Sequence, residues 1–297
     1  GRAKPMVLLA PSQVCGHGLG ERFQMEEPSV ALAISNFLRQ HDLVQVLWVF
    51  LSPSFRTDTP ARRGDTIGVQ GPVQDGAGEN GERLVFEGPL LIVGGGEVDP
   101  GMLAALAERA AGLVGADRGG DILMAAGLVP DAVIGDMDSV SDRTRFPAET
   151  RILALSEQDT TDFEKCLYST RAPVTLALGM TGGRFDHTLA ALHAVARHAA
   201  ERRIILIDGY DLALGVSGSI RFEIDVGARV SVYPLGRTRF ARSLGLRYGL
   251  DGLELVQGKT IGTSNRAEAR EICIEVESAG DDPWLLILER DNLKSFI

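Results

Sequence analysis

The 297-residue chain is 44% hydrophobic and 24% charged, the balance of a globular protein with a real core. Its formal net charge of −10 argues against a general nucleic-acid binder, which needs a cationic face, and no stretch reaches the roughly 18 apolar residues of a membrane span. Three cysteines, Cys15, Cys166 and Cys273, are odd in number and widely scattered, so they indicate neither a disulfide framework nor a zinc site. This usage favours a reducing compartment, and we expect a cytoplasmic protein.

The chain divides into three regions by the texture of its sequence. Residues 1–85 lack steady periodicity and include a Gly-rich stretch at 71–81, so we expect an N-terminal extension of unknown role. A chain that begins near Arg83 is expected to keep its melting temperature and its activity. Residues 86–210 predict an α/β domain, and residues 211–297 a smaller β domain.

From Pro89 onward, short apolar runs alternate with helical patterns. Strands are expected at 90–93, 113–117, 132–135, 152–155, 174–178 and 204–207, and helices at 100–111, 119–126, 161–169 and 185–199. This alternation predicts a parallel, Rossmann-like sheet with helices on both faces. Ligands bind such sheets outside the carboxyl ends of the strands, so polar residues at these ends are the candidates for function.

After residue 210 the helical pattern disappears. Short strands are expected at 219–224, 229–233, 253–256, 271–276 and 284–288, separated by turns. This pattern predicts a smaller antiparallel β-sandwich domain.

Carboxylates follow two neighbouring strands of the α/β region. Asp117 ends one strand, and Asp136 and Asp138 follow the next. Like charges this close are costly unless a cation lies between them, and Mg²⁺ takes one or two carboxylates together with substrate phosphates. A solvated loop pair, common in a chain with 40 acidic residues, is the alternative.

Two further loops lie at the same edge of the predicted sheet. In the loop before the helix at 161–169, Thr161 or Asp159 could serve as an ordinary helix cap. In the loop before the next helix, Gly182 and Gly183 allow close backbone approach to a ligand, and Arg184 suits phosphate, although a plain strand-to-helix turn would look alike. Together with the acids these loops predict a metal and polyphosphate site, as phosphoryl transfer requires.

The order of these motifs resembles the thiamine pyrophosphokinase family from about Leu90 to the C-terminus. The matching segments are Ala116–Asp117 with Gly119–Gly120, then 135–139, 158–165, 182–187, 245–248 and 262–265. The resemblance implies a nucleotide domain followed by a β-sandwich, working as a homodimer. It also implies Mg²⁺-dependent transfer of the diphosphate of ATP to the hydroxyl of thiamine, with release of AMP.

The resemblance assigns residues to three groups. The catalytic and metal-binding acids would be Asp117, Asp136, Asp138 and Asp162; the nucleotide and substrate residues would be Gln158, Thr161, Gly183, Arg184 and Asp186; and the thiamine side of a site shared across the dimer would be Tyr248, Ser264 and Asn265. Arg118 and Gly249 depart from the pattern of the family, and Tyr248 could instead be an ordinary half-buried strand residue.

Three other functions fit parts of this pattern. A pyrophosphokinase for another hydroxymethyl heterocycle, such as a pterin, would need the same acids and a different acceptor pocket. A metal-dependent phosphohydrolase with Asp136 as nucleophile would also follow an apolar strand with Asp-x-Asp, but the glycine–arginine loop has no role in it. A nucleotide sensor would not need so many acids.

Overall fold

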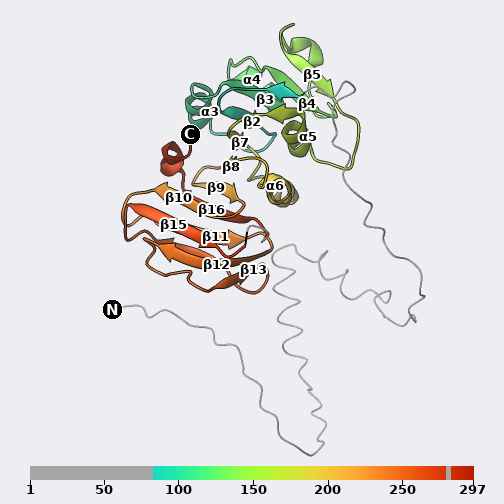
Figure 1. The fold of residues 1–297 in the computed structure, drawn as a ribbon. Coiled ribbons are helices and arrows are strands. Elements are labelled where there is room, and N and C mark those ends of the chain that lie inside the picture. Colours follow the sequence, from blue (N-terminus) through green and yellow to red (C-terminus); the bar gives the residue numbers. More distant parts are fainter. Residues whose placement is uncertain (1–82, 279–281) are drawn as a thin grey trace, which may run out of the picture. The chain divides into compact units, whose positions relative to one another are not determined.

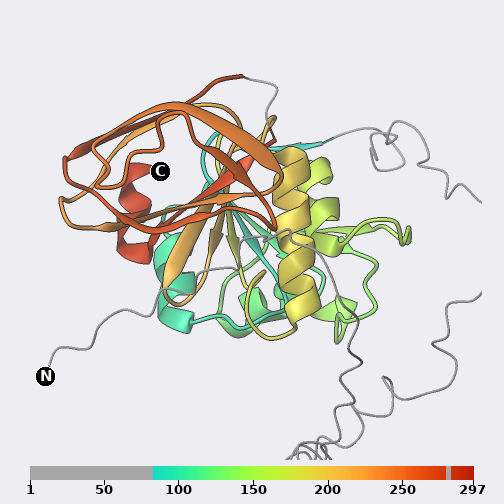
Figure 2. The same ribbon diagram turned by 90° about the horizontal axis from the view of Figure 1, so that it is seen from below.

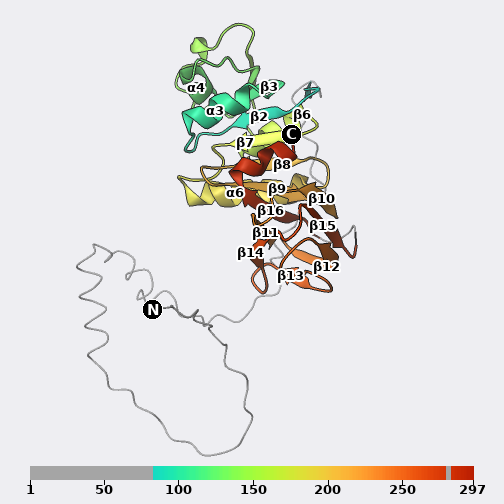
Figure 3. The same ribbon diagram turned by 90° about the vertical axis from the view of Figure 1, so that its left-hand side faces the viewer.

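The computed structural model describes residues 83–278 and 282–297, so most of the expected N-terminal extension lies outside the described residues. A ten-stranded sheet runs through the described part, in the order β14-β11-β16-β9-β8-β7-β2-β3-β4-β5 (Figure 1). Figure 3 shows these strands following one another along the molecule. The expected mixed α/β class is confirmed.

One half of this sheet is parallel. Its strands are β2 (Leu90–Val93), β3 (Gly112–Ala116), β4 (Ala132–Gly135), β5 (Arg151–Ala154), β7 (Thr175–Leu178) and β8 (Ile204–Ile207). Every residue of β2, β4, β7 and β8 is buried, which explains why their sequences are continuously apolar. All six expected strands are present, with bounds that shift by one residue at most.

Helices cover both faces of the parallel half. They are α3 (Pro100–Ala107), α4 (Gly119–Ala125), α5 (Asp162–Ser169) and α6 (Phe185–His198). The buried leucines of α3 and α4 belong to one apolar cluster, and the buried apolar residues of α5 and α6 belong to another. Figure 2 shows α6, in yellow, on the opposite side of the strands from the teal α3.

Helix α3 ends four residues earlier than the sequence predicts. The amides of Arg109 and Ala110 bond to carbonyls only three residues back, and Ala111 N–H donates to Pro89 O at 2.7 Å. This tight final turn brings the chain back to β3 at Gly112.

The other half of the large sheet is antiparallel and belongs to the C-terminal region. It contains β9 (Asp211–Val216), β16 (Trp284–Glu289), β11 (Arg229–Pro234) and β14 (Gly262–Arg266). Strand β9 pairs directly with β8, so hydrogen bonding continues across residue 210. Strands β9 and β14 are absent from the sequence prediction.

A separate four-stranded sheet lies against this antiparallel half. Its order is β10 (Ile220–Glu223), β15 (Glu271–Val276), β12 (Arg237–Leu244) and β13 (Glu254–Val256), of which β12 is also absent from the prediction. The rings of Phe240 on β12 and Trp284 on β16 meet edge to face, with centroids 5.6 Å apart. Both sheets contribute to one buried cluster.

Short elements complete the described part of the chain. They are β1 (Leu84–Val85) paired with β6 (Thr170–Arg171), and the 3-10 helices Arg143–Arg145 and Arg290–Ser295. Among the described residues, no helix is long and apolar enough to cross a membrane.

Candidate active site

A cavity of about 690 Å³ opens at the carboxyl ends of the parallel strands. Its walls come from the loops after β2, β3, β4, β5 and β7 and from the first turns of α5 and α6. The edge predicted from the sequence therefore carries a real cavity. Its lining includes the predicted residues Asp117, Asp136, Gln158, Thr161, Asp162, Gly183 and Arg184.

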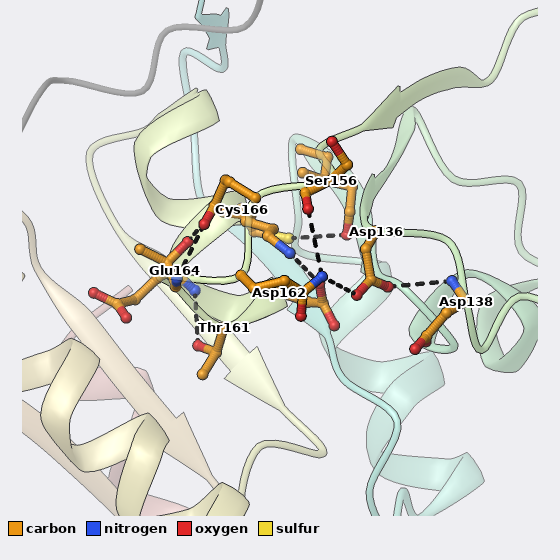
Figure 4. Close-up of polar contacts among 12 residues, drawn as sticks. Asp136, Asp138, Ser156, Thr161, Asp162, Glu164 and Cys166 are labelled. Carbon is orange, nitrogen blue, oxygen red and sulfur yellow. Dashed lines mark hydrogen bonds and ion pairs between the residues drawn. The ribbon is translucent and has the colours of Figure 1, made fainter.

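Three carboxylates converge beside this cavity. Asp117 directly follows β3, and Asp136 and Asp138 follow β4. One oxygen from each of the three lies within 4.8 Å of the others. Figure 4 shows Asp136 and Asp138 side by side, with Asp162 reaching toward Asp136 from α5.

The backbone around these acids is held in unusual conformations. Asp117 has a φ of 46° and Met137, between the two other acids, a φ of 66°. Residues other than glycine adopt this left-handed region at a cost, and such residues cluster at functional sites. Gly135 leaves the room needed, because a Cβ there would lie 2.9 Å from both Asp117 Cβ and Asp162 Oδ1.

The pKa values of Asp117 and Asp136 are shifted in opposite directions. Burial raises the pKa of Asp117; the Ser139 hydroxyl opposes this shift, and the charges of Asp162, Asp138 and Asp136 add to it. The pKa of Asp136 is lowered, because its carboxylate accepts the Asp138 amide at 3.1 Å and the Gln158 side chain at 3.2 Å. The cluster thus combines a carboxylate whose charged form is favoured by hydrogen bonds with one whose charged form is disfavoured by burial and by the neighbouring charges.

This donor set fits a divalent cation. Asp117 is 5% exposed, and its Oδ1 has no hydrogen-bond partner among the described residues. A buried, unpartnered carboxylate oxygen beside two more carboxylates is a costly arrangement that a hard cation such as Mg²⁺ would relieve.

Asp162 belongs to the same cavity but faces a different partner. Burial raises its pKa, while the Lys165 ammonium, 3.3 Å from Asp162 Oδ1, opposes that shift. Lys165 lines the cavity, and its side chain is only 2% exposed. The sequence reasoning assigned no role to Lys165, although its position three residues after Asp162 places both on one helix face.

Gln158 and Thr161 have local structural roles as well as places in the cavity wall. Gln158 bonds to Asp136, and the Thr161 hydroxyl accepts the amide of Glu164 at 3.4 Å as the cap of α5 (Figure 4). The helix-cap reading of Thr161 is therefore correct, and a substrate contact would be an additional role.

The glycine–arginine loop forms another part of the cavity wall. Gly182 and Gly183 both have positive φ, 81° and 62°, and the loop leads into α6 at Phe185. The guanidinium of Arg184 makes two bonds to Asp186, at 3.1 and 2.6 Å, which lower the pKa of Asp186. Arg184 lines the cavity, whereas Asp186, its exposed partner, is not among the lining residues.

A second glycine loop, Gly94–Gly96, follows β2 and lines the cavity, although the sequence predicts no role for it. A Cβ on Gly94 or Gly96 would lie 2.6 Å from the carbonyl oxygen of Gly179, so only glycine allows this backbone contact. Arg118, the departure from the family pattern, has helical backbone angles immediately before α4 and lines the cavity. It therefore adds a cation to the cavity wall.

The predicted thiamine residues lie together, away from this cavity. Tyr248 is 62% exposed, and its backbone pairs with the side chain of Asn265 on β14, next to Ser264. Strand β14 is the edge of the large sheet opposite β5. The residues that line the cavity all fall between Gly94 and Ala191.

Comparison with known proteins places the chain in a family. A family model described as "Thiamin pyrophosphokinase, catalytic domain" matches residues 103–207. Thiamine pyrophosphokinase 1 of Arabidopsis thaliana is 32% identical over 184 residues, which cover 55% of this chain and 67% of that protein. Thiamine pyrophosphokinase 1 of rice, Oryza sativa subsp. japonica, is 31% identical over 178 residues, covering 54% and 66%.

The chain belongs to the thiamine pyrophosphokinase family. Its alignments span about two thirds of these relatives' length. The crystal structure of thiamin pyrophosphokinase from Geobacillus thermodenitrificans superposes with a TM-score of 0.57 at 25% identity, covering 68% of this chain and 97% of that one. The segment matched by the thiamine pyrophosphokinase model contains every predicted acid and the glycine–arginine loop.

Proposed function

We propose that the protein is a thiamine diphosphokinase, which transfers the diphosphate of ATP to the hydroxyl of thiamine and releases AMP. The observation that carries the proposal is the convergence of Asp117, Asp136 and Asp138 beside a cavity that the glycine–arginine loop also lines. Family membership supports the same activity.

The residues of the cavity have complementary tasks in this reaction. We assign the metal to the clustered Asp117, Asp136 and Asp138, with Gln158 holding the carboxylate of Asp136. We add Asp162 as a fourth acid because it lines the same cavity. When bound, Mg²⁺ would neutralise the charge that builds on the transferred phosphate oxygens. Arg184 and Lys165 supply cationic hydrogen-bond donors for the polyphosphate, and Gly183 lets it approach the backbone.

The thiamine side is assigned to Tyr248, Ser264 and Asn265 of a second copy. In the large sheet, β14 and β4 are eight strand steps apart, roughly 38 Å at about 4.8 Å per step. One thiamine molecule is far too short to bridge that span within a chain. A homodimer that places β14 of one subunit over the cavity of its partner would complete the site.

This arrangement gives the two halves of the fold different tasks. The parallel, Rossmann-like part, residues 86–210, would hold ATP and metal. The antiparallel half, with the four-stranded sheet on it, would act as a β-sandwich thiamine and dimerisation domain over residues 211–297. The site would work in the cytoplasm, with no nucleic acid or membrane as partner.

Resolving the nucleotide products of the full chain with ATP, Mg²⁺ and thiamine tests the proposal. AMP and thiamine diphosphate in equal amounts are the expected result. ADP or free phosphate as the product would point to a kinase or phosphohydrolase instead. Faster AMP formation with a hydroxymethyl pterin than with thiamine would move the assignment to that acceptor.

Tyr248→Ala tests the acceptor assignment. Thiamine is flat and cationic, so an aromatic face should attract it by stacking and cation–π contact, worth about 0.5–2 kcal/mol. We expect this variant to raise the KM for thiamine several-fold and to leave the KM for ATP nearly unchanged, whereas Tyr248→Phe should be mild. A lower melting temperature with both KM values unchanged would instead show that Tyr248 only packs.

A further inference from the structure

A β-bulge interrupts the pairing of β11 with the edge strand β14. Val230 pairs with Asn265, and Val232 pairs with Gly262. One residue separates the valines, whereas two separate their partners, so β14 carries one extra residue opposite Ser231. Bulges of this kind bend a strand and re-aim a side chain, and they are common next to active sites.

The extra residue is held in a strained conformation by a buried hydroxyl. Ser264 has a φ of 62°, a conformation normally left to glycine in a bulge. Its side chain is exposed, and its amide donates to Ser231 Oγ at 2.9 Å. Ser231 itself is 3% exposed, so it supports the bulge from beneath and is not within reach of a ligand outside.

A second buried polar side chain supports the loop that carries Tyr248. Asn265 is 5% exposed, and its Oδ1 accepts the amides of Tyr248 at 3.0 Å and Arg266 at 2.8 Å. Its Nδ2 donates to the carbonyl of Tyr248 at 2.7 Å. The side-chain amide of Asn265 therefore pairs with the backbone N–H and C=O of Tyr248 much as a neighbouring strand would. The side chain of Tyr248 stays exposed to solvent.

We propose that Ser231 and Asn265 are positioning residues, which hold the side chains of Ser264 and Tyr248 in the orientation that receives the acceptor. This inference rests on the proposed function and refines it. Asn265, included above with the thiamine side, acts through Tyr248 because its amide oxygen is already fully used. Ser231, which has no role in the sequence-based prediction, acts through Ser264. Each exposed acceptor residue thus has its own buried anchor.

A double-mutant cycle between Asn265 and Tyr248 distinguishes positioning from contact. We expect Asn265→Ala to raise the thiamine KM about as much as Tyr248→Ala, leave the ATP KM unchanged, and add nothing in the Tyr248→Ala background. Asn265→Asp keeps the acceptor oxygens and should restore part of the loss. Additive effects of the two alanine changes would mean that Asn265 touches thiamine itself, and would overturn the inference.

The bulge is tested by a pair of changes at Ser264 and Ser231. Ser264→Gly relieves the backbone strain and removes the hydroxyl, so it should raise the melting temperature while raising the thiamine KM several-fold. Ser231→Ala should raise the same KM, with no further increase when combined with Ser264→Gly. A Ser264→Gly protein with unchanged thiamine KM would show that the bulge does not serve the acceptor.

Hydrogen exchange gives a readout that does not depend on turnover. The amide of Tyr248 should exchange faster in Asn265→Ala, and that of Ser264 faster in Ser231→Ala, each measured in the full-length protein. Thr238→Ala is the matched control, since its buried hydroxyl also bonds to backbone elsewhere in the β region, donating to the carbonyl of Asp282 at 2.9 Å. It should lower the melting temperature and leave both amides and the thiamine KM unchanged.

The outcomes separate the inference from the function on which it rests. If the wild-type chain forms no thiamine diphosphate, the proposed function fails. If the wild type is active and Tyr248→Ala raises the thiamine KM, but Asn265→Ala changes neither this KM nor the Tyr248 amide, the function stands and the positioning role falls.

Discussion

Replacing Asp136 with asparagine is expected to leave a folded protein whose kcat is at least about 10²–10³-fold lower. The reason is that preorganised charges usually contribute most of the rate enhancement in such reactions. The carboxylate accepts one backbone amide and one side-chain amide, and asparagine keeps an acceptor oxygen for the backbone bond. What disappears is the charge beside Asp117 and Asp138. We expect Asp138→Asn to behave in the same way.

Steady-state kinetics with Mg²⁺ titration, next to thermal unfolding, measures this effect. Asp142→Asn is the matched control, because Asp142 also caps local backbone after β4 but does not line the cavity. Its kcat should stay at the wild-type level. Near-normal turnover of Asp136→Asn, with an unchanged melting temperature, would remove Asp136 from the metal site.

The location of the site follows from the sequence because of how parallel sheets are built. Strands β2, β4, β7 and β8 are buried on both faces, so their sequences are uninterrupted apolar runs that can be read directly. A carboxylate placed right after such a run must lie at the carboxyl edge. The sequence therefore predicts that Asp117 and Asp136 lie close together, and the structure confirms their convergence.

The edge strand β14 could not be predicted in this way. Its five residues, Gly262–Arg266, include no large apolar side chain, and only Asn265 is buried. It forms a strand because β11 supplies its hydrogen bonds, which is a long-range pairing that no local pattern reports. The junction of β8 with β9, which joins two expected domains into one sheet, is equally long-range and was missed for the same reason.

Long-range packing also explains why the sequence points to Asn265 but not to Ser231, and why it does not show that the side chain of Asn265 is buried. Asn265 stands next to Ser264 and shares its motif, so both were assigned to thiamine. Only the fold shows that one side chain faces outward while the other is 5% exposed and bonded to Tyr248. Ser231, distant in sequence, becomes visible only once the bulge in β14 lies opposite it.

Lys165→Met is expected to reduce kcat by on the order of 10²-fold and to raise the KM for ATP, the scale found when one preorganised charge or donor is removed from a reaction site. The Lys165 ammonium lies 3.3 Å from Asp162 in the cavity wall, with the side chain 2% exposed. Its positive charge also helps lower the pKa of Asp136. Methionine fills the same volume and removes only the charge and its hydrogen bonds.

The alternative is that Lys165 merely balances the charge of Asp162. The two roles separate when Lys165→Met is combined with Asp162→Asn, which removes the carboxylate as well. If charge balance were the whole role, the double variant should regain the stability that Lys165→Met loses, measured by the melting temperature. Its kcat should then be no lower than that of Asp162→Asn alone. If Lys165 holds the polyphosphate, the ATP KM should stay high in the double variant even where stability returns. Lys294→Met, an exposed lysine in the last helical turn, is the control and should change neither KM nor melting temperature.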